Sequence, residues 1–269
     1  MKKFLEHSYN RDWELALIEN FMREGVNDPG IFKAFFTAGG PGSGKSHVAS
    51  NTMGLRSGGA FGLKVIDSDP AFKLLLKHAG LTSKPADIFS PAGQAQREKA
   101  KSLTKKQQGA YLEGRLGLLI DGTGKDYKKI KTMSDALRGI GYDTFMLFVN
   151  TSLDVAIQRD QMRERTLGED EVTRMWNAVQ QNMGKFQQYF GRENFILVDN
   201  NNATEKIFDK LHVQIEKLIK KKPSSRAANA WIKSQQRGWQ IPKIWYNNCY
   251  EYSDGYKLPS TAISTFRAI

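Results

Sequence analysis

Short apolar runs recur along the chain, separated by longer stretches in which apolar residues return at helical spacing. The runs cover residues 31–38, 63–66, 116–120, 144–149 and 195–198. Short apolar runs that alternate with helical segments are typical of βαβ units, whose strands are buried on both faces of a parallel sheet. The pattern therefore predicts an α/β fold in which a parallel five-stranded sheet lies between helices.

Two stretches carry the clearest helical spacing. Residues 11–24 predict an amphipathic helix that begins near Asp12 and ends before Gly25, and we expect it to cover an edge of the sheet. Residues 154–190 predict helices that are interrupted at Gly168.

Polar residues directly follow the apolar runs. Asp67 and Asp69 follow the second run, and Asp121 and Thr123 follow the third. The carboxyl ends of parallel strands form the ligand-binding edge of such a sheet. We therefore expect these four side chains to gather at one edge, although they lie far apart in the sequence.

The first run leads into a loop that matches the pattern G-x-x-x-x-G-K-[ST] without departure. The loop and the residue after it are Gly39, Gly40, Pro41, Gly42, Ser43, Gly44, Lys45, Ser46 and His47. Glycines allow successive backbone N–H groups to turn toward a phosphate, and the N-terminus of the following helix adds partial positive charge. Lys45 would reach the β- and γ-phosphates, and the Ser46 hydroxyl is a ligand for Mg²⁺. The loop predicts a site for ATP with Mg²⁺.

The end of the third run indicates what happens to the γ-phosphate. Many motor and helicase ATPases follow the aspartate at this position with a glutamate that helps to position a hydrolytic water. Here Gly122 follows Asp121, which favours transfer to a hydroxyl. Asp121 is also a candidate to hold Mg²⁺ together with Ser46.

A carboxylate at the end of the second run would face the γ-phosphate from the acceptor side. Asp69 could orient a hydroxyl there and accept its proton, which makes it the candidate general base. Because Asp69 precedes Pro70, it could also cap a helix. Asp67 and Thr123 are candidate substrate-side groups, and for Asp67 a metal-side role stays open.

Arginines in the predicted helical segment are candidates for a lid. A guanidinium on a mobile lid stabilises the charge that develops during phosphoryl transfer and screens the site from water. Arg159 and Arg163 lie four residues apart and share a helix face, while Arg165 points elsewhere. We expect Arg163 or Arg165 to be catalytic; a solvated basic face is the alternative.

On these motifs the chain resembles the zeta-toxin and polynucleotide-kinase branch of P-loop kinases. The resemblance rests on the phosphate loop and on the strand ends at 66–69 and 119–123, and it covers about residues 30–200. It implies a parallel five-stranded sheet between helices, Asp69 as general base, and phosphates held by Lys45 and lid arginines.

The resemblance leaves two classes of acceptor, a nucleotide sugar or a nucleic-acid 5′ end. Asp121 stands where zeta toxins usually have glutamate. Residues 70–73 replace the further aspartate and arginine that polynucleotide kinases commonly have. An alternative of another class is a nucleic-acid or assembly protein that binds ATP and turns over little.

Charge and composition fit these interpretations. The formal net charge of +12 favours anionic partners such as nucleotides or nucleic acid. No apolar stretch is long enough to span a membrane, and the first residues lack the apolar core of a signal peptide. Cys249 is the only cysteine, which excludes an internal disulfide. We expect a cytoplasmic protein without a membrane partner; the sequence indicates no particular protein partner.

The composition changes near the C-terminus. Residues 217–243 contain eight Lys or Arg and no Asp or Glu, and aromatic residues follow them. We therefore predict a kinase domain over 1–222 and a basic, aromatic extension over 223–269. Positive charge with aromatic faces is typical of single-stranded nucleic-acid sites. Alternatively, Trp231 and Trp239 anchor the extension to the domain and its lysines face water.

Overall fold

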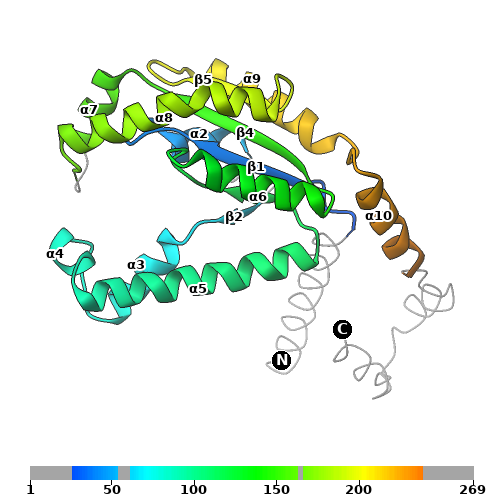
Figure 1. Cartoon of the computed structure of the whole chain (residues 1–269), viewed down its shortest axis with the longest axis horizontal. Coiled ribbons are helices and arrows are strands. Elements are labelled where there is room, and N and C mark those ends of the chain that lie inside the picture. Colours follow the sequence, from blue (N-terminus) through cyan, green and yellow to red (C-terminus); the bar gives the residue numbers. More distant parts are fainter. Residues whose placement is uncertain (1–25, 54–60, 163–165, 239–269) are drawn as a thin grey trace, which may run out of the picture. The chain divides into compact units, whose positions relative to one another are not determined.

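The computed structural model of the chain describes residues 26–53, 61–162 and 166–238 (Figure 1). The chain divides into two units, residues 1–229 and 230–269. The predicted helix at 11–24, together with Arg163, Arg165, Trp239 and Cys249, lies outside the described residues.

The strands form a five-stranded sheet in the order β2-β3-β1-β4-β5, and each pairing is parallel. They are β1 (Lys33–Ala38), β2 (Lys64–Ile66), β3 (Leu118–Ile120), β4 (Asp143–Asn150) and β5 (Phe195–Asp199). The prediction of an α/β fold with five parallel strands is confirmed, and each apolar run corresponds to one strand.

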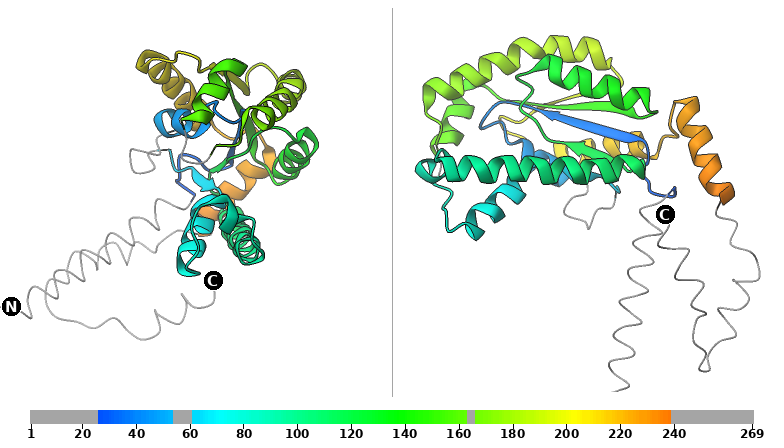
Figure 2. Two further views of the ribbon diagram at one scale, coloured as in Figure 1. Left: turned by 90° about the vertical axis from the view of Figure 1, so that its left-hand side faces the viewer. Right: turned by 60° about the horizontal axis from the view of Figure 1, so that its bottom comes forward.

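Helices cover both faces of the sheet, and α3, α4 and α5 form an arm beside β2 (Figures 1 and 2). The α2 and α9 helices lie on one face, and α6 and α8 lie on the other. Their bounds are α2 (Lys45–Thr52), α3 (Asp69–His78), α4 (Pro85–Ile88), α5 (Pro91–Glu113), α6 (Tyr127–Gly139), α7 (Leu153–Gln161), α8 (Glu169–Phe190), α9 (Glu205–Lys220) and α10 (Arg226–Gly238). The predicted break at Gly168 is confirmed, since this residue precedes α8 with a positive φ of 89°.

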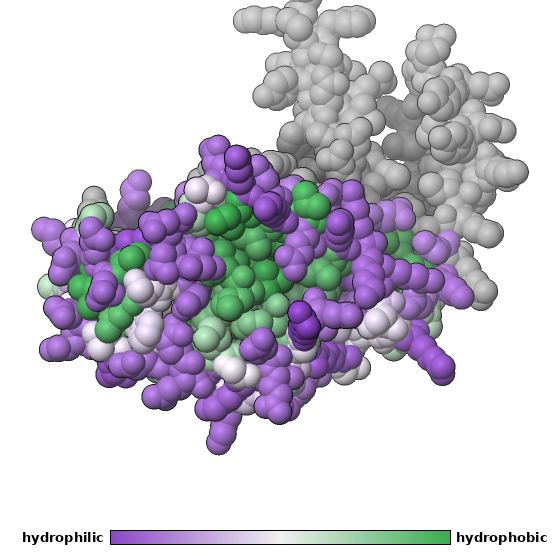
Figure 3. Space-filling model, turned by 90° about the horizontal axis from the view of Figure 1, so that it is seen from above, coloured by the Kyte–Doolittle hydropathy of each residue, from purple (hydrophilic) through white to green (hydrophobic). Residues whose placement is uncertain are grey.

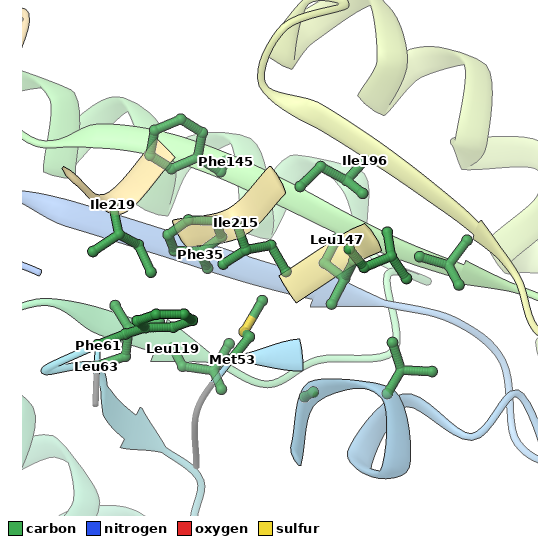
Figure 4. Packing of buried hydrophobic residues seen from close by; sticks show 14 of the residues in the cluster. Phe35, Met53, Phe61, Leu63, Leu119, Phe145, Leu147, Ile196, Ile215 and Ile219 are labelled. Atoms are coloured by element: carbon green, nitrogen blue, oxygen red, sulfur yellow. The ribbon is translucent and has the colours of Figure 1, made fainter. Parts of the chain in front are cut away.

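The core follows from the alternation of side chains along β1. Phe35 points to the face covered by α2 and α9, where it stacks on Phe145 of β4 with ring centroids 4.7 Å apart (Figure 4). Phe36 points to the opposite face and contacts Phe190 of α8. Both faces of the central strand are therefore buried, as a run of consecutive apolar residues requires.

The β5 strand is an edge strand, and the surface near it is partly apolar. Leu197 of β5 and Val213 of α9 are 52% and 47% exposed. From above, an apolar area is visible within polar surroundings (Figure 3). No helix in the described part of the chain is both long enough and apolar enough to cross a membrane.

The end of the sheet opposite the phosphate loop holds the segment that leads into α10. Lys33 is buried and pairs with Asp143 at 2.6 Å, and Asp143 also accepts hydrogen bonds from Ser224. Pro223 and Ala228 are buried. The first unit thus continues to Asn229. The domain boundary after residue 222 stays a prediction.

Candidate active site

The phosphate loop connects β1 to α2, and its glycines are needed where the chain packs most closely. Gly44 has a φ of 78°, and a Cβ atom there would lie 2.5 Å from Nδ2 of Asn200. Gly42 has a φ of 73°, and a Cβ atom there would overlap the backbone of Ala156 in α7. The loop conformation is therefore accessible to glycine and costly for other residues at both positions.

The start of α2 is arranged to receive an anion. The helix begins without a side-chain hydrogen bond to its first turn, as suits a helix N-terminus that binds an anion. Lys45 donates from Nζ to the carbonyl oxygen of Gly39 at 2.9 Å, which holds the ammonium group over the loop. Ser46 and His47 are exposed in the same turn.

Two residues that the sequence analysis did not single out support the loop. Asn200 donates to the carbonyl oxygen of Ser43 at 2.7 Å, and Trp176 packs beside Gly40. Asn200 follows β5 directly, so its place after an apolar run was the available signal. Trp176 lies within α8 and carried no comparable signal.

Arg159 is bound to the loop backbone. Its guanidinium group donates to the carbonyl oxygens of Gly42, Asn200 and Asn201 at 3.4, 2.8 and 3.2 Å. These bonds join the phosphate loop to the segment after β5. Arg159 therefore has a structural role here, and the other two arginines of the predicted lid lie outside the described residues.

A cavity of about 440 Å³ opens beside the start of α2. It combines a guanidinium group, an aromatic ring and several amide groups, which suits a flat, polar ring system. Its lining residues are Gly44, His47, Arg159, Asn200, Asn201, Asn202, Ala203 and Phe208.

The end of β3 is hydrogen-bonded to the end of β1. The Thr37 hydroxyl donates to Asp121 at 2.5 Å and accepts from the N–H of Gly122 at 3.2 Å. The N–H of Gly39 donates to the carbonyl oxygen of Thr123 at 3.0 Å. The first residue of the phosphate loop is thus bonded to the segment that carries Asp121 and Thr123.

A second cavity, of about 410 Å³, lies at these strand ends and is called the acceptor cavity below. Asp67, Asp121 and Thr123 line it. Ile66 pairs with Ile120 in the sheet, so the two aspartates follow neighbouring residues of adjacent strands. Burial raises the pKa of Asp67, and the nearby charges of Asp69 and Asp121 act in the same direction.

Asp69 lies on the other side of the start of α3. It is the first residue of this helix and Ser68 takes the N-cap position, so the alternative that Asp69 is the cap is wrong. The Asp69 side chain is 66% exposed, lies 3.8 Å from Arg97, and lines a separate cavity of about 770 Å³. Asp67 and Asp121 therefore line one cavity and Asp69 lines another with Arg97, although the charge of Asp69 still acts on Asp67.

The residues predicted to hold Mg²⁺ fit such an ion. In the described part of the chain, no group of three or more His, Cys, Asp or Glu side chains is arranged to hold a metal by itself. A Mg²⁺ ion that arrives with a nucleotide needs only one or two protein oxygens, because phosphates and waters supply the rest. The exposed Ser46 hydroxyl and the Asp121 carboxylate, anchored through one oxygen by Thr37, are donors of this kind.

Comparison with known proteins assigns the chain to a family. The model of the family described as Zeta toxin matches residues 26–213, more than half of the chain. No curated protein matches the sequence.

Solved structures resemble the chain at low sequence identity. Shikimate kinase from Bacteroides thetaiotaomicron is 14% identical, with 70% of this chain and 99% of that chain covered and a TM-score of 0.43. A chain of the PezAT toxin–antitoxin system of Streptococcus pneumoniae is 14% identical, with 70% of this chain and 84% of that chain covered and a TM-score of 0.42. A chain of the native AvrRxo1-ORF1:-ORF2 complex is 14% identical, with 84% of each chain covered and a TM-score of 0.47. These identities are too low to carry an activity from those proteins to this chain.

Proposed function

This chain belongs to the zeta toxin family, and we propose that it transfers the γ-phosphate of ATP to a hydroxyl of a nucleotide-like acceptor. The observation that carries the proposal is the junction between the phosphate loop and the acceptor cavity. Gly39 of the loop donates to Thr123, and Thr37 of the strand before the loop donates to Asp121. A nucleotide triphosphate bound by the loop would therefore lie next to a pocket lined by carboxylates.

In this proposal ATP lies along the loop. The backbone N–H groups and Lys45 bind the β- and γ-phosphates. The cavity between Arg159 and Phe208 receives the base. Ser46 and Asp121 would hold Mg²⁺, which neutralises charge on the phosphates when bound.

The acceptor hydroxyl enters from the acceptor cavity. Its oxygen forms a bond to the γ-phosphorus while the bond from that phosphorus to the bridging oxygen breaks, so ADP leaves. The hydroxyl proton passes to a carboxylate. Asp69 is the base that the family resemblance implies. Asp67, which lines the cavity and whose pKa is raised by burial, is the second candidate for the base.

The test is incubation of the full chain with γ-labelled ATP and a panel of nucleotide sugars, nucleosides and 5′-hydroxyl oligonucleotides. We expect label on at least one hydroxyl acceptor and none with Lys45→Ala, while Lys77→Ala, an exposed lysine of α3 outside the loop and both substrate-side cavities, retains transfer. Retained ATP binding without any labelled acceptor would favour the alternative of an ATP-binding protein with little turnover.

A further inference from the structure

The lining of the acceptor cavity contains four lysines besides the carboxylates of Asp67, Asp121 and Asp126. Lys101 and Lys105 of α5 line it on one side, and Lys125 and Lys129, directly before and within α6, line it on another. The two helices flank the cavity but come from separate parts of the chain. A pocket that only had to present a carboxylate to a hydroxyl would not need four ammonium groups.

The carboxylates that line the cavity do not form ion pairs with these lysines. Asp121 accepts from Thr37, and Asp67 accepts from the N–H of Asp69. The Asp126 carboxylate accepts from the first turn of α6 as its N-cap. Each carboxylate is therefore engaged by a local hydrogen bond and forms no ion pair with a lysine of the cavity among the described residues.

Two of the four lysines have acidic neighbours outside the cavity. Lys101 pairs with Glu98 at 2.7 Å, and Lys125 lies close enough to Glu171 to lower its pKa. Lys105 and Lys129 have no ion-pair partner in the described part of the chain. They are exposed, one on each of the two helices, and both line the same cavity.

We propose that Lys105 and Lys129 bind phosphate oxygens of the acceptor and so determine which hydroxyl compounds are phosphorylated. This proposal rests on the proposed kinase function and adds the recognition element to it. Two ammonium groups from different helices match a diphosphate, which carries charge on each phosphate, or a phosphodiester, whose single charge is shared by two oxygens. The volume of about 410 Å³ is within the range of small-molecule sites and leaves room for a sugar beside the phosphates.

Matched lysines on the same helices provide the controls. Lys106 neighbours Lys105 on α5, and Lys128 neighbours Lys129 on α6; both are exposed and neither lines the cavity. Each pair of glutamine variants therefore has the same charge and the same helix, and differs only in whether the removed lysine faces the cavity.

The experiment measures transfer from ATP to UDP-glucose and to a 5′-hydroxyl dinucleotide, each beside its phosphate-free counterpart, glucose or the nucleoside. We expect the phosphate-bearing acceptors to be preferred. Lys105→Gln and Lys129→Gln should each raise KM for them about ten-fold, the usual effect of one charge-assisted hydrogen bond, with kcat nearly unchanged. Lys106→Gln and Lys128→Gln should leave KM unchanged. Label on UDP-glucose would indicate a nucleotide sugar as acceptor, and label on the dinucleotide would indicate a nucleic-acid 5′ end.

Equal use of the phosphate-free acceptors, or equal KM values for the cavity and control variants, would overturn the proposal. If no acceptor is labelled, the proposed function fails, and lysine reactivity decides this inference separately. The full chain is saturated with AMP-PNP, which fills the phosphate loop, and acetylated with and without UDP. If UDP protects Lys105 and Lys129 from acetylation but not Lys106 and Lys128, the proposed phosphate contacts are supported. Equal acetylation of all four lysines in the presence of UDP would refute them.

Discussion

Asp67→Asn and Asp69→Asn would identify which carboxylate accepts the proton of the acceptor. A positioned general base contributes about 10²–10⁴-fold to a rate, which corresponds to about 2.7–5.5 kcal/mol of barrier. If Asp69 is the base, as the family resemblance implies, we expect Asp69→Asn to slow transfer by about this factor. If Asp67, which lines the acceptor cavity, is the base, we expect Asp67→Asn to do so. Neither change should greatly alter ATP binding.

The structure indicates that both variants fold. Asparagine at position 67 retains an oxygen that can accept from the N–H of Asp69. The ion pair of Asp69 with Arg97 is exposed at the aspartate, so its loss costs at most about 1 kcal/mol. Since the folded-state pKa of Asp67 is raised, its ionisation lowers stability as pH rises through that pKa, and Asp67→Asn removes this loss.

The assay is the pH dependence of kcat for the wild type and both variants. If Asp67 is the base, burial and its acidic neighbours place the acidic limb of the profile above the ordinary range of an aspartate, and Asp67→Asn abolishes that limb. Collapse of ATP binding in Asp69→Asn would instead make Asp69 a structural or metal-side residue. Transfer that neither variant slows would refute the reasoning, because another group would then orient the acceptor.

Three further predictions concern the loop, the sheet and the C-terminal unit. Asn200→Ala leaves the Ser43 carbonyl of the phosphate loop without this hydrogen bond, which costs about 1–3 kcal/mol and should raise KM for ATP, whereas Asn194→Ala, before β5 and outside the lining of both cavities, should not. Asp143→Ala leaves the buried Lys33, whose pKa is already lowered by burial, without its ion-pair partner and should lower the free energy of unfolding by about 3–5 kcal/mol in a denaturant titration. Asp143→Asn should lower it less. A chain that ends at Asn229 should retain ATP binding but lose affinity for single-stranded nucleic acid, and binding by the full chain should weaken steeply with salt; equal affinity of both chains would contradict this.

The sheet could be predicted from the sequence because its signal is local. Five apolar runs gave five strands, and the glycine pattern located the loop between the first strand and the next helix. The strand order β2-β3-β1-β4-β5 was not predicted, since it depends on contacts between runs and not on the runs themselves.

The site could be predicted only in part because its details depend on packing. Asp67 precedes α3 and Asp69 is its first residue, so the cavity that each side chain lines depends on where this helix begins. The bond from Asn200 to Ser43 joins residues that are 157 positions apart. No sequence period encodes such a contact.

Transfer of label from γ-labelled ATP to a hydroxyl acceptor, compared between the wild type and Lys45→Ala at equal concentrations of folded protein, tests the central claim most directly. We predict a labelled acceptor and ADP with the wild type, and neither with the variant, because the loop would lose the lysine that binds the β- and γ-phosphates. Undiminished transfer by Lys45→Ala would contradict it, and so would an absence of transfer by a wild type that still binds ATP.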